Sequence, residues 1–159
     1  MRLLARLAAV LLILLVGGCA LSVPSDPDGT LDRVRDDGVL RAGASVSPGW
    51  VDVSADGRRP VGREPDLVMR FAESLGAEVE WTLGGEEHLV GLLEKGDLDL
   101  VVGGLTDQNA WVDKAALTRP FAEERVAGTT EKHVMMVPMG ENAWQSELER
   151  WLDENAGGR

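Results

Sequence analysis

Apolar and polar residues follow two different spacings along this chain, and the spacings alternate. Residues 39–44 and 98–102 are short, mostly apolar runs of strand length, and residues 78–82 alternate so that Val79 and Trp81 face the same way. Residues 65–75 and 86–95 instead place their apolar side chains on one helical face, and a glycine follows each stretch. The order strand, helix, strand, helix, strand therefore predicts an α/β fold.

The third predicted strand, residues 98–102, indicates what kind of sheet this is. It is apolar except for Asp99, and a nearly continuous apolar run is typical of a parallel strand covered by helices on both faces. We expect a single lobe with a mostly parallel, doubly wound sheet and flanking helices. Ligands of such sheets bind beyond the carboxyl ends of the strands, where residues 45–50 and 103–106 fall.

The remaining elements are shorter or lie near the C-terminus. The alternation in residues 50–61, with Asp56-Gly57 as a turn, predicts a small β-ribbon. Residues 110–115 are expected to form a short helix, and residues 134–137 a fourth strand of the same sheet. The stripe in residues 142–154 predicts a helix whose two tryptophans belong to the core.

The N-terminus has the pattern of a processing signal. A basic start precedes an apolar run, which at about ten residues is too short to span a bilayer. The Val-Gly-Gly-Cys that follows resembles the lipobox of bacterial lipoproteins, in which the cysteine carries the lipid. We expect a lipoprotein signal peptide at residues 1–18, lipidation of Cys19, a tether at residues 19–30 and one lobe at residues 31–156. The alternative is that Cys19 merely ends an ordinary signal peptide.

The net charge and the reactive residues argue against several classes of function. The formal net charge of −11 becomes −13 if residues 1–18 are removed, because Arg2 and Arg6 are lost with no acid, so nucleic acid is a poor partner. Cys19 is the only cysteine, which excludes an internal disulfide. No second ligand accompanies either histidine at metal-binding spacing, so no metal or cofactor is expected. No catalytic motif is present, and we expect no enzymatic activity.

Several motifs in order resemble the bacterial extracellular solute-binding proteins of the amino-acid-binding type, family 3. The motifs are Leu31-x-x-Val34, Gly38-Val39-Leu40, Pro48-Gly49-Trp50, Gly62-x-x-x-Asp66-Leu67, Leu93-x-x-Gly96-x-x-Asp99-Leu100, Gly103-Gly104-Leu105-Thr106 and Thr118-x-Pro120-Phe121. The resemblance implies two hinged lobes with a solute between them. Here only residues 122–133 stand where the second lobe would be, and even one strand-helix-strand unit needs about thirty residues. We therefore expect the first lobe alone.

The resemblance also implies which residues touch a ligand. Trp50 would stack on the solute, while Gly104, the Leu105 backbone and Thr106 would hydrogen-bond its polar groups. The family's carboxylate-binding arginine falls at Trp111, and an indole cannot replace a bidentate guanidinium. This departure favours an aromatic or apolar solute, or a protein partner, over a standard amino acid. The structural alternative is that both tryptophans only cover an exposed sheet edge.

These observations lead to two hypotheses of function. In the first, the chain is a lipid-anchored, extracytoplasmic solute-binding-like lipoprotein associated with a membrane transporter or permease. It would bind a small organic solute weakly, or with a partner lobe that a homodimer could supply. In the second, it is an interaction module that docks on a membrane transporter or sensor without binding a solute. We expect Trp50, Thr106 and Trp111 to converge on one open, shallow concavity. If residues 122–132 are only a short surface link, the monomer cannot close over a solute.

Overall fold

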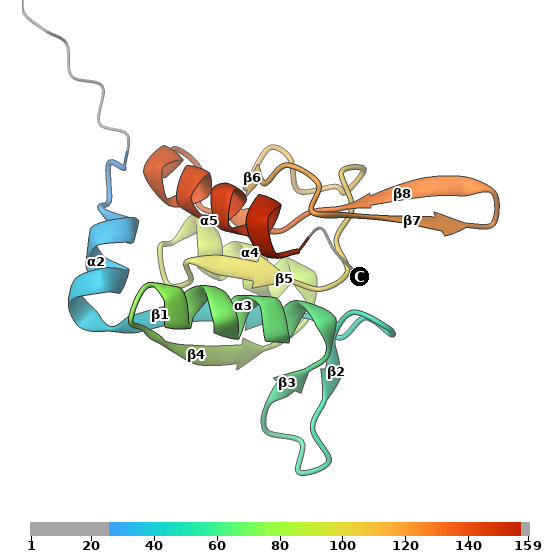
Figure 1. Cartoon of the computed structure of the whole chain (residues 1–159), viewed down its shortest axis with the longest axis horizontal. Helices are drawn as coiled ribbons and strands as arrows, with labels where there is room; N and C mark the ends of the chain where they lie inside the picture. The colour runs from blue at the N-terminus through green and yellow to red at the C-terminus, as the bar shows by residue number, and fades with distance from the viewer. Residues whose placement is uncertain (1–25, 157–159) are drawn as a thin grey trace, which may run out of the picture.

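A five-stranded sheet lies at the centre of the computed structural model, which describes residues 26–156 (Figure 1). Its strand order is β4-β1-β5-β9-β6. The bounds are Val39–Ala44 for β1, Glu78–Leu83 for β4, Leu100–Val102 for β5, Ala116–Leu117 for β6 and Met136–Val137 for β9. β1 pairs in parallel with β4 and β5, whereas β9 runs antiparallel to both β5 and β6. The sheet is therefore mixed, with β5 at its centre, as the apolar run predicted.

Helices cover both faces of this sheet, and each face has its own apolar cluster. The helices are α2 (Thr30–Asp37), α3 (Arg63–Ser74), α4 (Glu86–Glu94) and α5 (Asn142–Asn155). On one face Phe71 of α3 packs against Trp144 of α5, with ring centroids 5.3 Å apart. On the other face Leu89 and Leu93 of α4 form a second cluster. Every residue of β5 is buried because both of its faces are covered.

Two small antiparallel ribbons project from the lobe (Figure 1). In the first, β2 (Asp52–Val53) pairs with β3 (Pro60–Val61), which confirms the expected ribbon. Its loop is longer than the two-residue turn suggested by Asp56-Gly57, because the Ser54 N–H donates to the Arg59 carbonyl across it at 2.8 Å. In the second, β7 (Ala122–Val126) pairs with β8 (Thr129–His133).

Residues 110–115 do not form the expected helix but a tight turn that leads directly into β6. The Asn109 side-chain oxygen accepts the Trp111 N–H at 2.9 Å, and its amide donates to the Thr106 carbonyl at 2.6 Å. The N–H groups of Lys114 and Ala115 then both donate to the Trp111 carbonyl. An asparagine that binds the backbone in this way competes with helix formation, which explains the wrong prediction.

The lobe begins earlier than expected, because Asp26 already binds it. One oxygen of Asp26 accepts the N–H groups of Ala143 and Trp144 at the start of α5, each at 3.0 Å. Its other oxygen accepts the N–H of Leu31 in α2, also at 3.0 Å. One carboxylate thus caps two helices that are far apart in sequence.

Glu141 completes this arrangement from the other side. It is almost fully buried, and its two oxygens accept the N–H groups of Asp28 and Thr30, both at 2.9 Å. We call Asp26 and Glu141 the amino-terminal clamp. Residues 26–30, expected in the tether, are therefore part of the lobe, whereas Cys19 and residues 1–18 lie outside the described residues.

Asp99, the only charged residue of the third apolar run, has a structural role. Its side chain is 1% exposed and pairs with both Arg33 and Arg41. The Arg41 guanidinium lies 2.6 Å from Oδ1, and the Arg41 N–H donates to Oδ2 at 2.9 Å. The hydrogen bond to Asp99 raises the pKa of Arg41. This network ties α2 to the strands.

No helix within residues 26–156 has the length and apolar character needed to cross a membrane.

Candidate functional site at the carboxyl edge of the sheet

Trp50, the residue expected to stack on a ligand, follows β1 at the carboxyl edge of the sheet but is only 7% exposed. The imidazole of His133 stacks on it, with ring centroids 3.7 Å apart and planes inclined by 27°. The guanidinium carbon of Arg63 lies 4.6 Å from the centroid of the same indole, in cation–π range. Phe121 meets the indole edge-on at 6.1 Å. The chain therefore covers Trp50 with its own planar side chains.

His133 reaches Trp50 because the base of the β7–β8 hairpin pairs with the segment that follows β5. The Asp107 N–H donates to the Lys132 carbonyl at 3.0 Å, and the Val134 N–H donates to the Leu105 carbonyl at 2.9 Å. Thr106 and His133 face each other in this antiparallel bridge. The Leu105 carbonyl, part of the backbone expected to bind a solute, is engaged by the hairpin instead.

Neither ring nitrogen of the buried His133 imidazole forms a hydrogen bond of good geometry, although the backbone of Gly104 lies close enough to raise the pKa of the ring. The ring is 2% exposed, and its nearest carboxylate oxygen, on Glu124, lies 3.8 Å from Nε2. Burial lowers the pKa of His133, and this outweighs the opposing effect of Glu124 and Glu131. The side chain is therefore neutral at pH 7, and the stack on Trp50 is its main interaction.

Glu64, in the first turn of α3, has contacts in the site that sequence reasoning missed, as does His133. It is fully buried, and its Oε2 accepts the N–H groups of Gly103 at 2.9 Å and Gly104 at 2.8 Å. Its Oε1 has no hydrogen-bond partner. Burial raises the pKa of Glu64 to about 7, against the lowering effect of the two amides and Arg63. In the sequence it reads as an ordinary acidic residue near a helix start, so only the fold exposes its role.

Gly104 contacts both Glu64 and Trp50, because its backbone lies very close to these side chains. Its φ of 64° is in the left-handed region. A Cβ at this position would lie 2.3 Å from the Ser47 Oγ and 3.2 Å from the Trp50 Cδ1. Both the conformation and the space require glycine, and Gly104 therefore holds Glu64 on one side and Trp50 on the other.

The structure brings together Trp50, Gly104 and Thr106 around His133, but it places Trp111 elsewhere. The Trp111 indole N–H donates to Glu86 of α4 at 3.1 Å, and the ring packs against the apolar cluster beneath α4. Leu105 is buried in that same cluster. Trp111, which stands where the family has its carboxylate-binding arginine, thus covers the second face of the sheet.

Residues 122–132, expected to be a short surface link, form most of the β7–β8 hairpin (Figure 1). Five residue pairs hold the two strands in register. The tip is a two-residue turn in which Ala127 and Gly128 have φ values of 49° and 88°, which matches the twist of a tight hairpin. The two segments that would cross to a second lobe are thus joined directly to each other.

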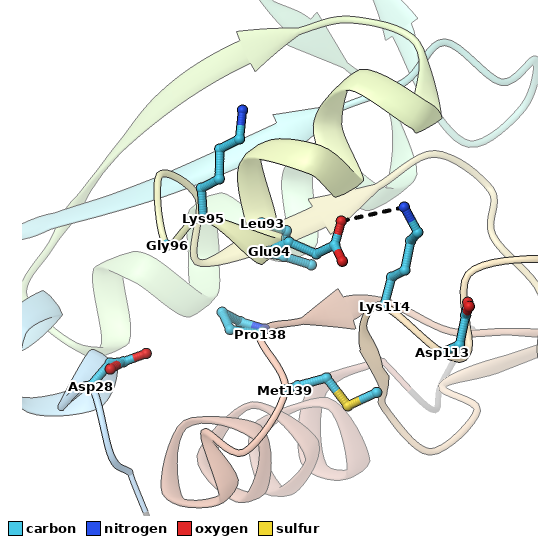
Figure 2. Close-up of a pocket in the computed structure, with 9 residues that line it drawn as sticks. All are labelled: Asp28, Leu93, Glu94, Lys95, Gly96, Asp113, Lys114, Pro138 and Met139. Carbon is cyan, nitrogen blue, oxygen red and sulfur yellow. Dashed lines mark hydrogen bonds and ion pairs between the residues drawn. The ribbon is translucent and has the colours of Figure 1, made fainter.

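Two hollows lie at the opposite, amino edge of the sheet. One of about 320 Å³ lies between the end of α4, the turn at Lys114 and Met139. Two of its lining residues form an ion pair, with Lys114 Nζ 3.5 Å from Glu94 Oε2, and Figure 2 draws this pair as a dashed line. The second, of about 340 Å³, adjoins Asp99 and shares Asp28 with the first. Within the described residues no three His, Cys, Asp or Glu side chains gather closely enough to hold a metal.

This fold and edge define a class: one lobe of an α/β binding protein, with an aromatic residue and a glycine turn beyond the strands. The model of the bacterial extracellular solute-binding proteins, family 3, matches residues 41–156, and the chain belongs to that family. The expected fold and family are confirmed.

Relatives with assigned names match part of the chain. It is 33% identical over 97 residues to membrane-bound lytic murein transglycosylase F of Vibrio cholerae serotype O1, covering 60% of this chain and 18% of the relative. The protein of the same name from Pseudomonas putida (strain W619) is 32% identical over 114 residues, covering 70% of this chain and 22% of the relative. The chain therefore spans about a fifth of the length of these relatives.

Solved structures share the fold at lower identity. The arginine-bound form of domain 1 from TmArgBP, of T. maritima, superimposes with a TM-score of 0.69 at 22% identity. The match covers 77% of this chain and 98% of that domain. An ancestral cationic amino acid solute-binding protein gives a TM-score of 0.70 at 14% identity, covering 79% of this chain and 93% of the other. The lobe thus corresponds in extent to a first domain.

Proposed function

We propose that the protein is an extracytoplasmic, lipid-anchored lobe that presents its carboxyl edge to a small organic solute. Binding is weak in the monomer, or is completed by a partner lobe, and a membrane transporter or permease is the associated machinery. Cys19 carries the lipid. The family's description as extracellular and the words "membrane-bound" in the relatives' name both support a place in the cell envelope.

The stack of His133 on Trp50 is the observation that carries this proposal. It is a planar group held 3.7 Å from an indole beside Gly104, in the place where the family resemblance puts a stacked solute. A planar solute of similar size that displaces His133 would regain the same stacking contact. On this proposal, His133 occupies the position that a stacked solute would take.

Three features make the monomer's affinity low. A solute has to displace His133, the amides of Gly103 and Gly104 already bind Glu64, and Trp111 replaces the carboxylate-binding arginine. Loss of one charge-assisted bidentate contact alone costs about 1.5–3 kcal/mol, roughly ten- to a hundredfold in affinity. For free amino acids we expect dissociation constants weaker than micromolar.

The second candidate is an interaction module without a solute. The observation in its favour is that Trp50 is buried and that the backbone of residues 105–107 is paired with the hairpin. If His133 never leaves, the projecting β7–β8 hairpin is the surface on which a transporter or sensor would dock.

We propose no enzymatic activity for this chain. The name of its relatives describes a murein enzyme, but the chain matches only about a fifth of their length. Glu64 is fully buried and its Oε2 accepts the N–H groups of Gly103 and Gly104, so its carboxyl group is not presented to a substrate.

Calorimetry against the twenty amino acids and planar nitrogen bases tests the proposal, with the non-lipidated chain and two variants. His133→Ala should tighten binding of a planar solute, because the indole no longer has to be uncovered. Trp50→Leu should abolish binding. If neither the wild-type chain nor His133→Ala binds any compound, the solute-binding function is wrong and the docking module remains. Micromolar binding of an amino acid by a proven monomer would contradict the expected weakness.

A further inference from the structure

The amino-terminal clamp fixes the point at which the chain enters the lobe. Asp26 binds the start of α5, and Glu141 binds Asp28 and Thr30. Asp28 also borders both hollows together with Lys95 and Gly96, which lie in the loop that leads into β5. The entry point therefore lies at the amino edge of the parallel strands.

The candidate binding edge is at the other end of the lobe. Trp50 and Gly104 follow the carboxyl ends of β1 and β5, and the β7–β8 hairpin continues outward from there. In Figure 1 the start of α2 and the tip of the hairpin lie at opposite ends of the molecule. The length of the lobe thus separates the entry point from the candidate site.

The chain between Cys19 and Asp26 is too short to bridge that length. It comprises seven steps along the backbone, and at most about 3.6 Å per residue gives a maximum reach of roughly 25 Å. A domain of about 130 residues has a radius of gyration near 14 Å, which corresponds to a sphere about 36 Å across. Even a fully extended segment cannot let the lobe turn over.

We propose that the lobe stands on its membrane with the amino edge toward the lipid and with Trp50 and the hairpin pointing away. This orientation rests on the lipid anchor at Cys19 in the proposed function. A solute or protein partner then reaches Trp50 from the space beyond the membrane. The acidic charge of the lobe also keeps it from lying flat on anionic lipid.

Energy transfer to the membrane surface tests the orientation. The full-length protein is isolated in acylated form from a bacterial host and placed in phosphatidylcholine vesicles that carry a headgroup acceptor dye. Two variants each add one free cysteine for a donor dye: Lys95→Cys at the amino edge and Val126→Cys in the hairpin, both at exposed positions. We expect several-fold stronger quenching at position 95 than at position 126.

A longer tether provides the matched control. Insertion of about twenty Gly and Ser residues between Ser25 and Asp26 gives the lobe enough chain to turn over, so the two positions should become similarly quenched. Equal quenching with the natural tether would overturn the orientation while leaving the anchor intact. Failure of a labelled fatty acid to attach at Cys19 would remove both the anchor and the orientation.

Discussion

The two edges of the sheet treat buried polar groups in opposite ways. At the amino edge the buried Asp99 and Glu141 and the half-buried Asp26 have hydrogen-bond partners for both carboxylate oxygens. At the carboxyl edge Glu64 leaves one buried oxygen unpaired and His133 leaves both ring nitrogens unpaired. Buried polar groups are normally paired, and exceptions are concentrated where function requires them. The comparison indicates that the amino edge stabilises the fold, whereas the unpaired groups of the carboxyl edge lower its stability.

The largest expected effect on stability comes from removing Asp99, a buried carboxylate at the amino edge. Asp99→Ala leaves Arg33 and Arg41 without their buried partner and should lower the free energy of unfolding by about 2–4 kcal/mol. Urea denaturation at pH 7 measures this. The matched control is Glu94→Ala, which removes an exposed ion pair with Lys114 and should cost less than about 0.5 kcal/mol. If both variants lost the same small free energy of unfolding, the amino edge would not be the stabilising edge.

At the carboxyl edge, Glu64 should make the stability of the fold depend on pH. Its folded pKa of about 7 lies above its ordinary value of 4.5, so the folded state binds more protons between these values. Stability from this residue is therefore fully present below about pH 4.5 and falls as pH rises through 7, by about 3 kcal/mol in total.

Glu64→Gln isolates that contribution, because an amide mimics the protonated acid and its oxygen can still accept both glycine N–H groups. We expect the variant to lose the decline in stability between pH 5 and pH 8 in urea titrations. The lowered pKa of His133 acts in the opposite sense, because stability from a depressed histidine is lost as pH falls below about 6.5. A decline of unchanged size in Glu64→Gln would assign the pH dependence to another group.

The smallest effect should come from replacing the unpaired imidazole. His133→Phe keeps a planar ring on Trp50 and removes two buried nitrogens that have no partner. We expect unchanged stability or a gain of up to about 1 kcal/mol, together with unchanged tryptophan fluorescence. His133→Ala is the control and should expose the indole to water and shift its emission to longer wavelength. A loss of more than about 2 kcal/mol in His133→Phe would mean that the nitrogens do have partners.

Local pattern was sufficient for the frame of the fold but not for the site. The strand and helix spacings, the central β5 and the strand at residues 136–137 were all predictable, because burial imposes a period on the sequence. The turn at Asn109 was not, since one side chain outcompeted a weak helical pattern. The stack of His133 on Trp50 joins residues 83 positions apart, and no local spacing encodes such a contact. The pairing of Glu64 with Gly103 and Gly104 was hidden for the same reason.

The amino-terminal clamp also has a consequence for the order in which the protein is made. The bonds from Asp26 to Ala143 and Trp144 join residues 117 and 118 positions apart. A ribosome releases the N-terminal segment long before the start of α5 exists, so Asp26 lacks its two partners in α5 during most of synthesis. Loop closure over such a distance is a late and slow event in folding. A chain that stops before α5 would therefore leave the entry segment unattached, however well the central strands had formed.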